Sequence, residues 1–125
     1  GQPARMTIHP APAGHGIVFR RVDLAADGAG ALIPARWDNV VPSQLCTLLQ
    51  GQGGATVSTV EHVMAALAGT GITNAVVEVN GPEIPILDGS SAPFVAGILA
   101  AVVDKLRTGN GRLVETSLLR AGVWA

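Results

Sequence analysis

The apolar pattern of residues 58–69 constrains the fold more than any other feature of the chain. Apolar side chains recur there at helical spacing: Val60, Val63, Met64, Leu67 and Ala68. They form one stripe along an amphipathic helix of about three turns. Gly69 and Gly71 favour the end of this helix, because glycine adopts left-handed backbone without a steric penalty. A helix of this kind has to bury its stripe against a second layer.

Strand patterns dominate the residues before this helix. Alternating or β-branched runs predict strands over residues 5–9, 16–22, 31–33, 37–41 and 45–49. In the second of these strands we expect Arg20 and Arg21 to face solvent. After the helix, residues 75–79 predict another strand and residues 83–86 a short edge strand, since Pro85 lacks a backbone N–H.

A second helix is predicted to begin at Ser90 or Ser91, with Pro93 in its first turn. Its buried face would carry Phe94, Ile98, Leu99, Val102 and Leu106. The order of strands and helices predicts the α+β class. We expect a two-layer domain in which a mainly antiparallel sheet carries both helices on one face.

Composition narrows the functional classes. A length of 125 residues suits one domain. Apolar residues make up 48% and charged residues 14%, so much of the surface is weakly polar. Either a covering partner or an Ala-rich coding bias accounts for this. The formal net charge of −1 creates no field that would attract nucleic acid, and we expect no nucleic-acid partner.

The sequence also bears on the compartment. The lone Cys46 cannot form an internal disulfide, which is compatible with a reducing compartment. Apolar runs such as Ile98–Val103 are far shorter than the about 20 residues that a membrane span needs. No stretch resembles a signal peptide. We expect a soluble, cytoplasmic protein with no membrane span.

The tripeptide Val60-Glu61-His62 places a carboxylate beside an imidazole at the start of the first helix. Ser58 and Glu61 fit the S-x-x-E capping box as N-cap and N3, which gives Glu61 a structural interpretation beside that of a general base. His62 is either an ordinary histidine or a metal ligand. A catalytic zinc site takes three protein ligands, and no residue nearby forms a helical i, i+4 pair with His62.

Two further residues need interpretation. Cys46 is interpreted from its pattern as a buried strand thiol, and it is not predicted to be a nucleophile because no base lies beside it in the sequence. Asp88 is either a turn residue or the carboxylate that accepts the second ring N–H of His62 and fixes its tautomer.

Several long motifs resemble one enzyme family in their order and spacing. They are Gly16–Leu24, Ile33–Ala35, Leu45–Thr47, Ala65–Asn74 and Gly81–Ser90, within a resemblance that runs from Arg5 to Leu99. The family is the zinc-dependent UDP-3-O-acyl-N-acetylglucosamine deacetylase, the committed step of lipid A synthesis in Gram-negative bacteria. From Thr108 onward no resemblance is seen.

The resemblance implies a domain organisation. Residues 1–107 would be the N-terminal deacetylase domain with its first hairpin truncated, and residues 108–125 a linker or divergent tail. The domain would be one half of the family's β-α-α-β sandwich, whose active site lies where the two domains meet. The second, C-terminal domain would be absent from this chain.

The resemblance also assigns roles to residues. Glu61 would be the general base, and His62 one zinc ligand, the other ligands being a His and an Asp of the missing domain. Leu45 and Cys46 would contact the substrate, UDP-3-O-acyl-N-acetylglucosamine, from which amide hydrolysis removes acetate. The isolated chain would be inactive.

Two other hypotheses remain open. The first is a non-catalytic α+β assembly or binding module that contacts a partner through its helix layer. The second is an unrelated antiparallel α+β binding domain in which the motifs occur by chance.

Overall fold

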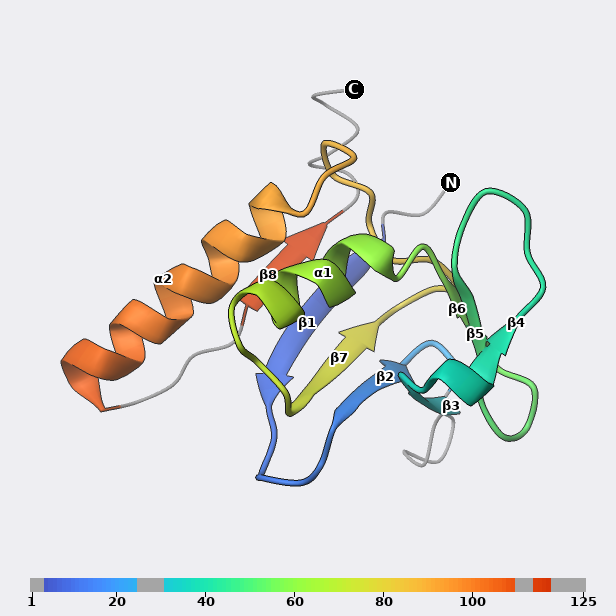
Figure 1. Ribbon diagram of the computed structural model, residues 1–125, viewed down its shortest axis with the longest axis horizontal. Helices are drawn as coiled ribbons and strands as arrows, with labels where there is room; N and C mark the ends of the chain where they lie inside the picture. The colour runs from blue at the N-terminus through green and yellow to red at the C-terminus, as the bar shows by residue number, and fades with distance from the viewer. Residues whose placement is uncertain (1–3, 25–30, 110–113, 118–125) are drawn as a thin grey trace.

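The computed structural model describes residues 4–24, 31–109 and 114–117, which form two sheets and two α-helices (Figure 1). The elements in chain order are β1 (Arg5–Pro10), β2 (Ile17–Arg21), β3 (Ala31–Pro34), the 3-10 helix η1 (Trp37–Asn39), β4 (Val40–Val41), β5 (Leu48–Gln50), β6 (Thr56–Ser58), α1 (Glu61–Gly69), β7 (Ala75–Val79), α2 (Ala92–Thr108) and β8 (Val114–Ser117).

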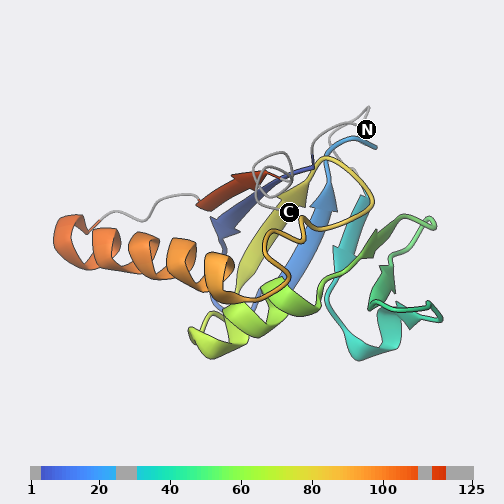
Figure 2. The same ribbon diagram turned by 90° about the horizontal axis from the view of Figure 1, so that it is seen from above.

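The larger sheet has five strands in the order β3-β2-β7-β1-β8. Antiparallel pairs join β1 to β7, β1 to β8 and β2 to β3, whereas β2 and β7 run parallel. Both helices cover the same face of this sheet (Figure 2). The predicted α+β fold, with a mainly antiparallel sheet and two helices on one face, is confirmed.

The core lies between that sheet face and the helices. Alternate residues of the strands point into it, as the period of two in a β-strand requires: Met6, Ile8, Phe19, Ile33, Ala75, Val77 and Val79. The helices contribute Val63, Ala66, Leu67, Phe94 and Ile98. Burying each large side chain of this set stabilises the fold by roughly 1.5–3 kcal/mol.

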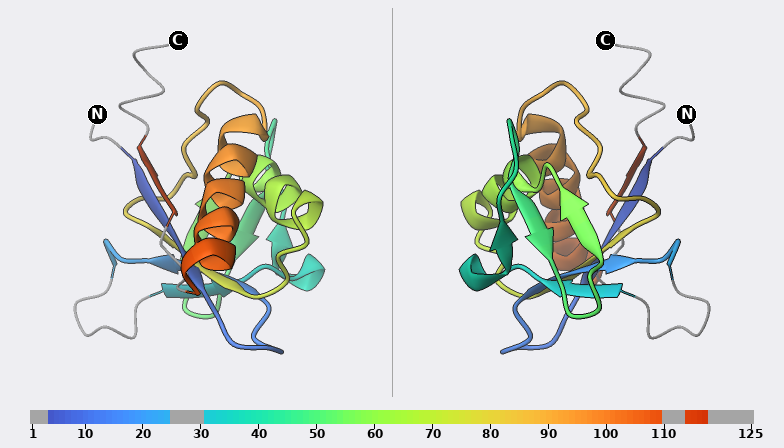
Figure 3. Two further views of the ribbon diagram at one scale, coloured as in Figure 1. Left: turned by 90° about the vertical axis from the view of Figure 1, so that its left-hand side faces the viewer. Right: turned by 90° about the vertical axis from the view of Figure 1, so that its right-hand side faces the viewer.

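A second, three-stranded sheet in the order β4-β5-β6 lies at the opposite end of the domain from the C-terminal end of α2 (Figures 1 and 3). Its β5–β6 hairpin approaches β3 very closely at Gly51. A Cβ at this position would lie 2.5 Å from the carbonyl oxygen of Leu32. Only glycine permits this approach without a shift of the backbone.

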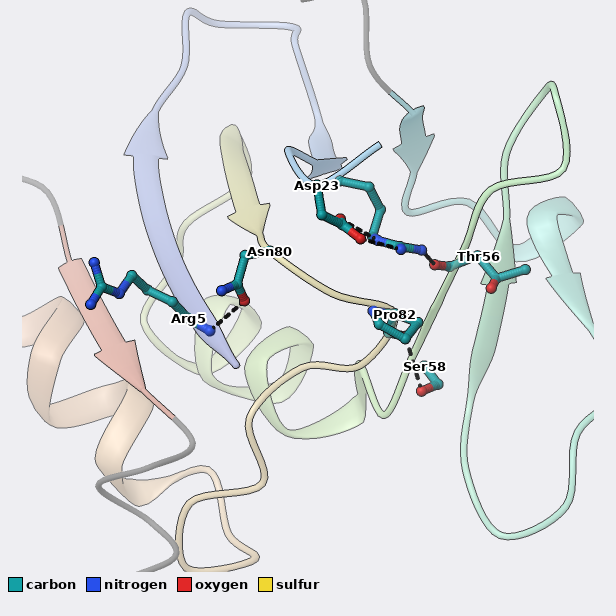
Figure 4. A network of polar contacts seen from close by, with 7 residues as sticks. Arg5, Asp23, Thr56, Ser58, Asn80 and Pro82 are labelled. Carbon is teal, nitrogen blue, oxygen red and sulfur yellow. Dashed lines mark hydrogen bonds and ion pairs between the residues drawn. The ribbon is translucent and has the colours of Figure 1, made fainter. Parts of the chain in front are cut away.

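Arg21 joins the two sheets. Its guanidinium donates to both carboxylate oxygens of Asp23, over 2.8 and 2.6 Å, and to the carbonyl oxygen of Thr56 over 2.7 Å (Figure 4). The prediction that Arg21 faces solvent is wrong, because it lies on the same face of β2 as Phe19 and is 6% exposed. Thr56, its partner on β6, lies 35 residues away in the sequence, so the local pattern around Arg21 did not predict this contact.

Three strand predictions are wrong in detail. Residues 37–39 form η1 instead of a strand, where Asn39 donates from its side chain to Pro34 O and from its backbone to Arg36 O. The strand predicted over 45–49 begins only at Leu48. Residues 83–86 form a single parallel bridge between Glu83 and Ser58 instead of an edge strand.

The second helix also differs from its predicted face. Phe94 and Ile98 are buried as expected, but Leu99 and Leu106 are 48% and 81% exposed. With Val103, which is 49% exposed, they form an apolar stripe on the side of α2 that the sheet does not cover. Figure 2 shows the C-terminal end of α2 extending past the strands. We call Leu99, Val103 and Leu106 the α2 stripe.

The residues after α2 are described only in part. Val114–Ser117 pairs with β1 as the edge strand β8, within the segment predicted as a linker or tail. Residues 110–113 and 118–125 of that segment lie outside the described residues. The predicted boundary between residues 107 and 108 stays a prediction.

The α2 stripe predicts association of the 125-residue chain in solution, because contiguous exposed apolar surface favours self-contact. Light scattering should detect species larger than a monomer, and a hydrophobic dye should fluoresce in its presence. Changing Leu99 and Leu106 to Lys should lower both signals, whereas changing the exposed but separate Trp37 to Lys should lower them less. A dye-silent monomer would contradict this expectation.

The Arg21–Asp23 pair predicts a second result. Asp23→Asn should lower the free energy of unfolding by about 1–3 kcal/mol, because a buried guanidinium loses its charged acceptor. The matched control is Asp38→Asn, which breaks the similar but exposed Arg36–Asp38 pair and should change stability too little to measure. Urea unfolding followed by circular dichroism measures both.

The pH dependence of this effect has a defined sign. The hydrogen bonds from Arg21 hold the pKa of Asp23 below its ordinary value of 3.8. A carboxyl whose pKa is lower in the folded state contributes stability above its unfolded pKa and loses it as the pH falls through the folded pKa. The difference in the free energy of unfolding between wild type and Asp23→Asn should therefore be largest at about pH 6 and decrease as the pH falls below 3.8. A difference that is constant with pH would contradict the pairing.

Candidate functional site

The start of α1 is not formed by a capping box. The helix begins at Glu61 with Val60 as its N-cap, and no side chain caps it. Ser58, the predicted cap, is the last residue of β6, and its backbone N–H and hydroxyl both donate to the carbonyl oxygen of Pro82, over 2.8 and 3.2 Å (Figure 4). The capping prediction is wrong because the helix begins three residues after Ser58, past the left-handed Thr59, and the Ser58 N–H that a capping box would offer to Glu61 is donated to Pro82.

Glu61 is instead held by the loop before β5. Its Oε2 accepts a hydrogen bond from the backbone N–H of Thr47 over 3.2 Å. The carbonyl oxygen of Thr47 in turn accepts from the N–H of Thr59 over 3.0 Å. A carboxylate in the first turn of a helix is also favoured by the helix dipole. The Glu61 carboxylate is therefore fixed by groups that the sequence pattern did not indicate.

Asp88 is held by hydrogen bonds from Ser90. Two hydrogen bonds from Ser90, through its backbone N–H at 2.9 Å and its hydroxyl at 2.7 Å, hold the pKa of Asp88 below its usual range. A positive charge on His62 lowers that pKa further. The observed hydrogen bonds of Asp88 are those of a turn residue.

Leu45 and Cys46 lie in the loop that leads to Thr47. The side chain of Leu45 is fully exposed. Cys46 is partly buried, with its sulfur 3.2 Å from the hydroxyl oxygen of Ser43. Neither residue belongs to a strand, so the interpretation of Cys46 as a buried strand thiol is wrong. The same loop therefore carries both the Thr47 N–H that donates to the Glu61 carboxylate and the exposed apolar side chain of Leu45.

Backbone strain gathers at these segments. Among the described residues, the non-glycine positions with positive φ are Leu45 at 67°, Thr59 at 60° and Leu87 at 57°. Leu45 and Leu87 directly precede Cys46 and Asp88, and Thr59 lies two residues before Glu61. Such conformations cost about 1–3 kcal/mol each and persist where surrounding contacts impose them. Nothing in the sequence marks these residues, because neither Leu nor Thr favours this region.

The described residues contain no complete metal site. Over residues 4–24, 31–109 and 114–117, no three His, Cys, Asp or Glu side chains come together as a set that could hold a metal ion. His62 fits one ligand of a zinc site, and a catalytic site needs three from protein. The donor set here is incomplete.

In the same residues, no helix has both the length and the apolar character needed to cross a membrane.

Comparison with known proteins places the chain in a family. A family model of the LpxC deacetylases, described as UDP-3-O-acyl N-acetylglycosamine deacetylase, matches residues 1–117. The match continues past Thr108, beyond which the sequence motifs showed no resemblance. The chain belongs to this deacetylase family.

Individual relatives agree with the family match. A UDP-3-O-acyl-N-acetylglucosamine deacetylase of Anaeromyxobacter dehalogenans is 55% identical over 114 residues, which cover 91% of this chain and 35% of the relative. The enzyme of that name from Geotalea uraniireducens is 53% identical over 114 residues, covering 91% and 36%. That from Citrifermentans bemidjiense is 54% identical over 103 residues, covering 82% and 32%. The chain spans about a third of the length of these curated relatives.

A zinc titration tests the incomplete donor set. The 125-residue chain should bind zinc weakly or not at all in calorimetry, because one histidine cannot close a catalytic site. His62→Ala should abolish any residual binding, whereas His15→Ala should leave it unchanged, since His15 lies on an exposed turn. Tight 1:1 binding that depends on His62 would overturn this view, because it would require donors that the described arrangement does not bring together with His62.

Proposed function

We propose that this chain forms the first domain of a zinc-dependent enzyme that removes acetate from UDP-3-O-acyl-N-acetylglucosamine in lipid A biosynthesis. The observation that carries the proposal is the placement of Glu61 and His62 side by side at the start of α1, in a chain of the deacetylase family. The reaction is hydrolysis of an amide, and the enzyme acts in the cytoplasm.

Glu61 acts as the general base. When bound, zinc would supply a Lewis acid that makes water a stronger acid near neutral pH. The carboxylate of Glu61 would accept a proton from the water that attacks the acetyl carbonyl. The contact with Thr47 uses Oε2, so Oε1 is the oxygen assigned to proton transfer. This arrangement fixes the carboxylate while leaving one of its oxygens for the reaction.

His62 provides one zinc ligand, through whichever ring nitrogen faces the metal. Asp88 is assigned one of two roles, as the turn residue that its bonds to Ser90 indicate or as a carboxylate that orients the His62 ring. Leu45 and Cys46 are assigned to the wall that contacts the substrate.

The rest of the site belongs to a second domain. Residues 1–107 form the N-terminal domain in this proposal, with residues 108–125 as a linker or tail. The coverage of about a third of each relative supports a second domain in the complete enzyme, because most of the relatives' length has no counterpart here. A His and an Asp of the second domain complete the metal site. The 125-residue chain is therefore inactive without that domain.

One observation favours a second candidate function. The α2 stripe gives the domain an exposed apolar surface, as a non-catalytic assembly module would require. The complete reading frame separates the two functions. A second domain with the His and Asp ligands supports the enzyme, and its absence supports the assembly module.

The role of Glu61 is tested in a two-domain enzyme that carries this chain as its first domain. Glu61→Gln keeps an oxygen that can accept from Thr47 but removes the base, so kcat should fall by about 100-fold or more while the melting temperature barely changes. Asp38→Asn, a similar carboxylate-to-amide change on the exposed η1, should leave kcat unchanged. Turnover retained in Glu61→Gln would sink the assignment.

A further inference from the structure

We propose that Thr59 and Glu83 are positioning residues that fix the Glu61 carboxylate for proton transfer. They do so by holding the chain in a left-handed turn where β6 passes into α1. This inference rests on the proposed function of Glu61, which it deepens by naming what keeps the base in place.

Thr59 occupies an unfavourable conformation. Its φ of 60° is left-handed, a region that β-branched residues rarely adopt. Its side chain is nevertheless almost completely buried, with 8% exposed. A glycine would satisfy the backbone at this position without strain, so the presence of threonine calls for a contribution from its side chain.

That contribution is a hydrogen bond to Glu83. The Thr59 hydroxyl donates to Oε1 of Glu83 over 2.9 Å. A hydrogen bond to a carboxylate is stronger than one between neutral groups. Together with the N–H bond from Thr59 to Thr47, it ties this residue to two segments that are distant from each other in sequence. These two contacts oppose the strain of the left-handed turn.

Glu83 is itself held in a fixed place. The carbonyl oxygen of Pro82 accepts from Ser58 over 2.8 Å, and the N–H of Ile84 donates to the carbonyl oxygen of Ser58 over 3.1 Å. Ile84 is 1% exposed and belongs to the core. The backbone on both sides of Glu83 is thus locked to β6. The carboxylate offers a pre-placed acceptor even though the Glu83 side chain reaches solvent.

The link to the base runs through Thr47. This residue accepts from Thr59 through its carbonyl and donates to Glu61 through its N–H. Thr59 therefore acts on Glu61 both along the chain, through Val60, and across the loop, through Thr47. A displacement of about 1 Å at a catalytic group can cost about 100-fold in rate. Loosening the turn should reduce proton transfer more than substrate binding.

The test uses conservative and disruptive variants of both residues in the two-domain enzyme. Thr59→Val keeps the shape but removes the hydroxyl, and Glu83→Ala removes the acceptor. Each should lower kcat by about tenfold or more with little change in KM. Thr59→Ser and Glu83→Gln keep a donor and an acceptor and should restore most of the turnover. The double variant Thr59→Val with Glu83→Ala should be no slower than the slower single variant, because both break one link.

A second readout needs no activity. Hydrogen–deuterium exchange at the Thr47 amide should be faster in Thr59→Val and Glu83→Ala than in wild type, and near wild type in Thr59→Ser and Glu83→Gln. If Thr59→Val does not fold, Glu83→Ala carries the test, since that side chain is exposed. Faster exchange with lower kcat, rescued by the conservative variants, supports the inference.

Two outcomes would overturn it. The first is wild-type kcat and wild-type Thr47 exchange in the disruptive variants. The second is an equal loss in the conservative variants, which would indicate a general packing role. Failure of the proposed function is distinguishable, because wild-type enzyme would then lack deacetylase activity while Thr47 exchange would still report on the turn.

Discussion

The structure depends on the burial of one face of a five-stranded sheet beneath two helices. Met6 and Val79, opposite each other on β1 and β7, are fully buried, and so are Phe19 on β2 and Val63 on α1. This burial is the main favourable contribution to the folding free energy. It also fixes where α1 starts, because the helix lies over the sheet only when Val63 and Leu67 face inward. The position of Glu61 and His62 follows from that packing.

The smaller sheet and the loops around it position the polar groups that contact the first turn of α1. Gly51 lets the β5–β6 hairpin contact β3, and Arg21 ties β6 to β2 through the carbonyl of Thr56. These contacts place Thr47 beside the first turn of α1. The strained residues and the Thr59–Glu83 bond lie in the same region, where polar contacts and not apolar burial decide the geometry. The core supplies rigidity, and the junction between the two sheets supplies the arrangement of the candidate catalytic groups.

Sequence patterns predicted the parts of this molecule that local periodicity controls. The stripe from Val60 to Leu67 identified α1, and alternation identified β1, β2 and β7. The same patterns misplaced Ser58, Arg21 and Leu106, each for a tertiary reason. Ser58 donates to Pro82, and Arg21 donates to Asp23 and Thr56. Leu106 is 81% exposed in the last turn of α2, the helix whose C-terminal end extends past the strands. Periodicity predicts the direction in which a side chain points from its own helix or strand. It does not predict which distant residues contact that side chain.

For the site, the sequence by itself determined which residues are present and which share a turn of helix. Glu61 and His62 are neighbours in any helix that includes both, and the resemblance to the family assigns candidate roles to them. Only the tertiary structure decided that Thr47 holds the Glu61 carboxylate, that Glu83 accepts from Thr59 and that Thr59 is left-handed. The Thr47–Glu61 and Thr59–Glu83 hydrogen bonds join residues 14 and 24 positions apart in the chain. No local propensity encodes them, because their energy arises only when the sheets and helices have packed together.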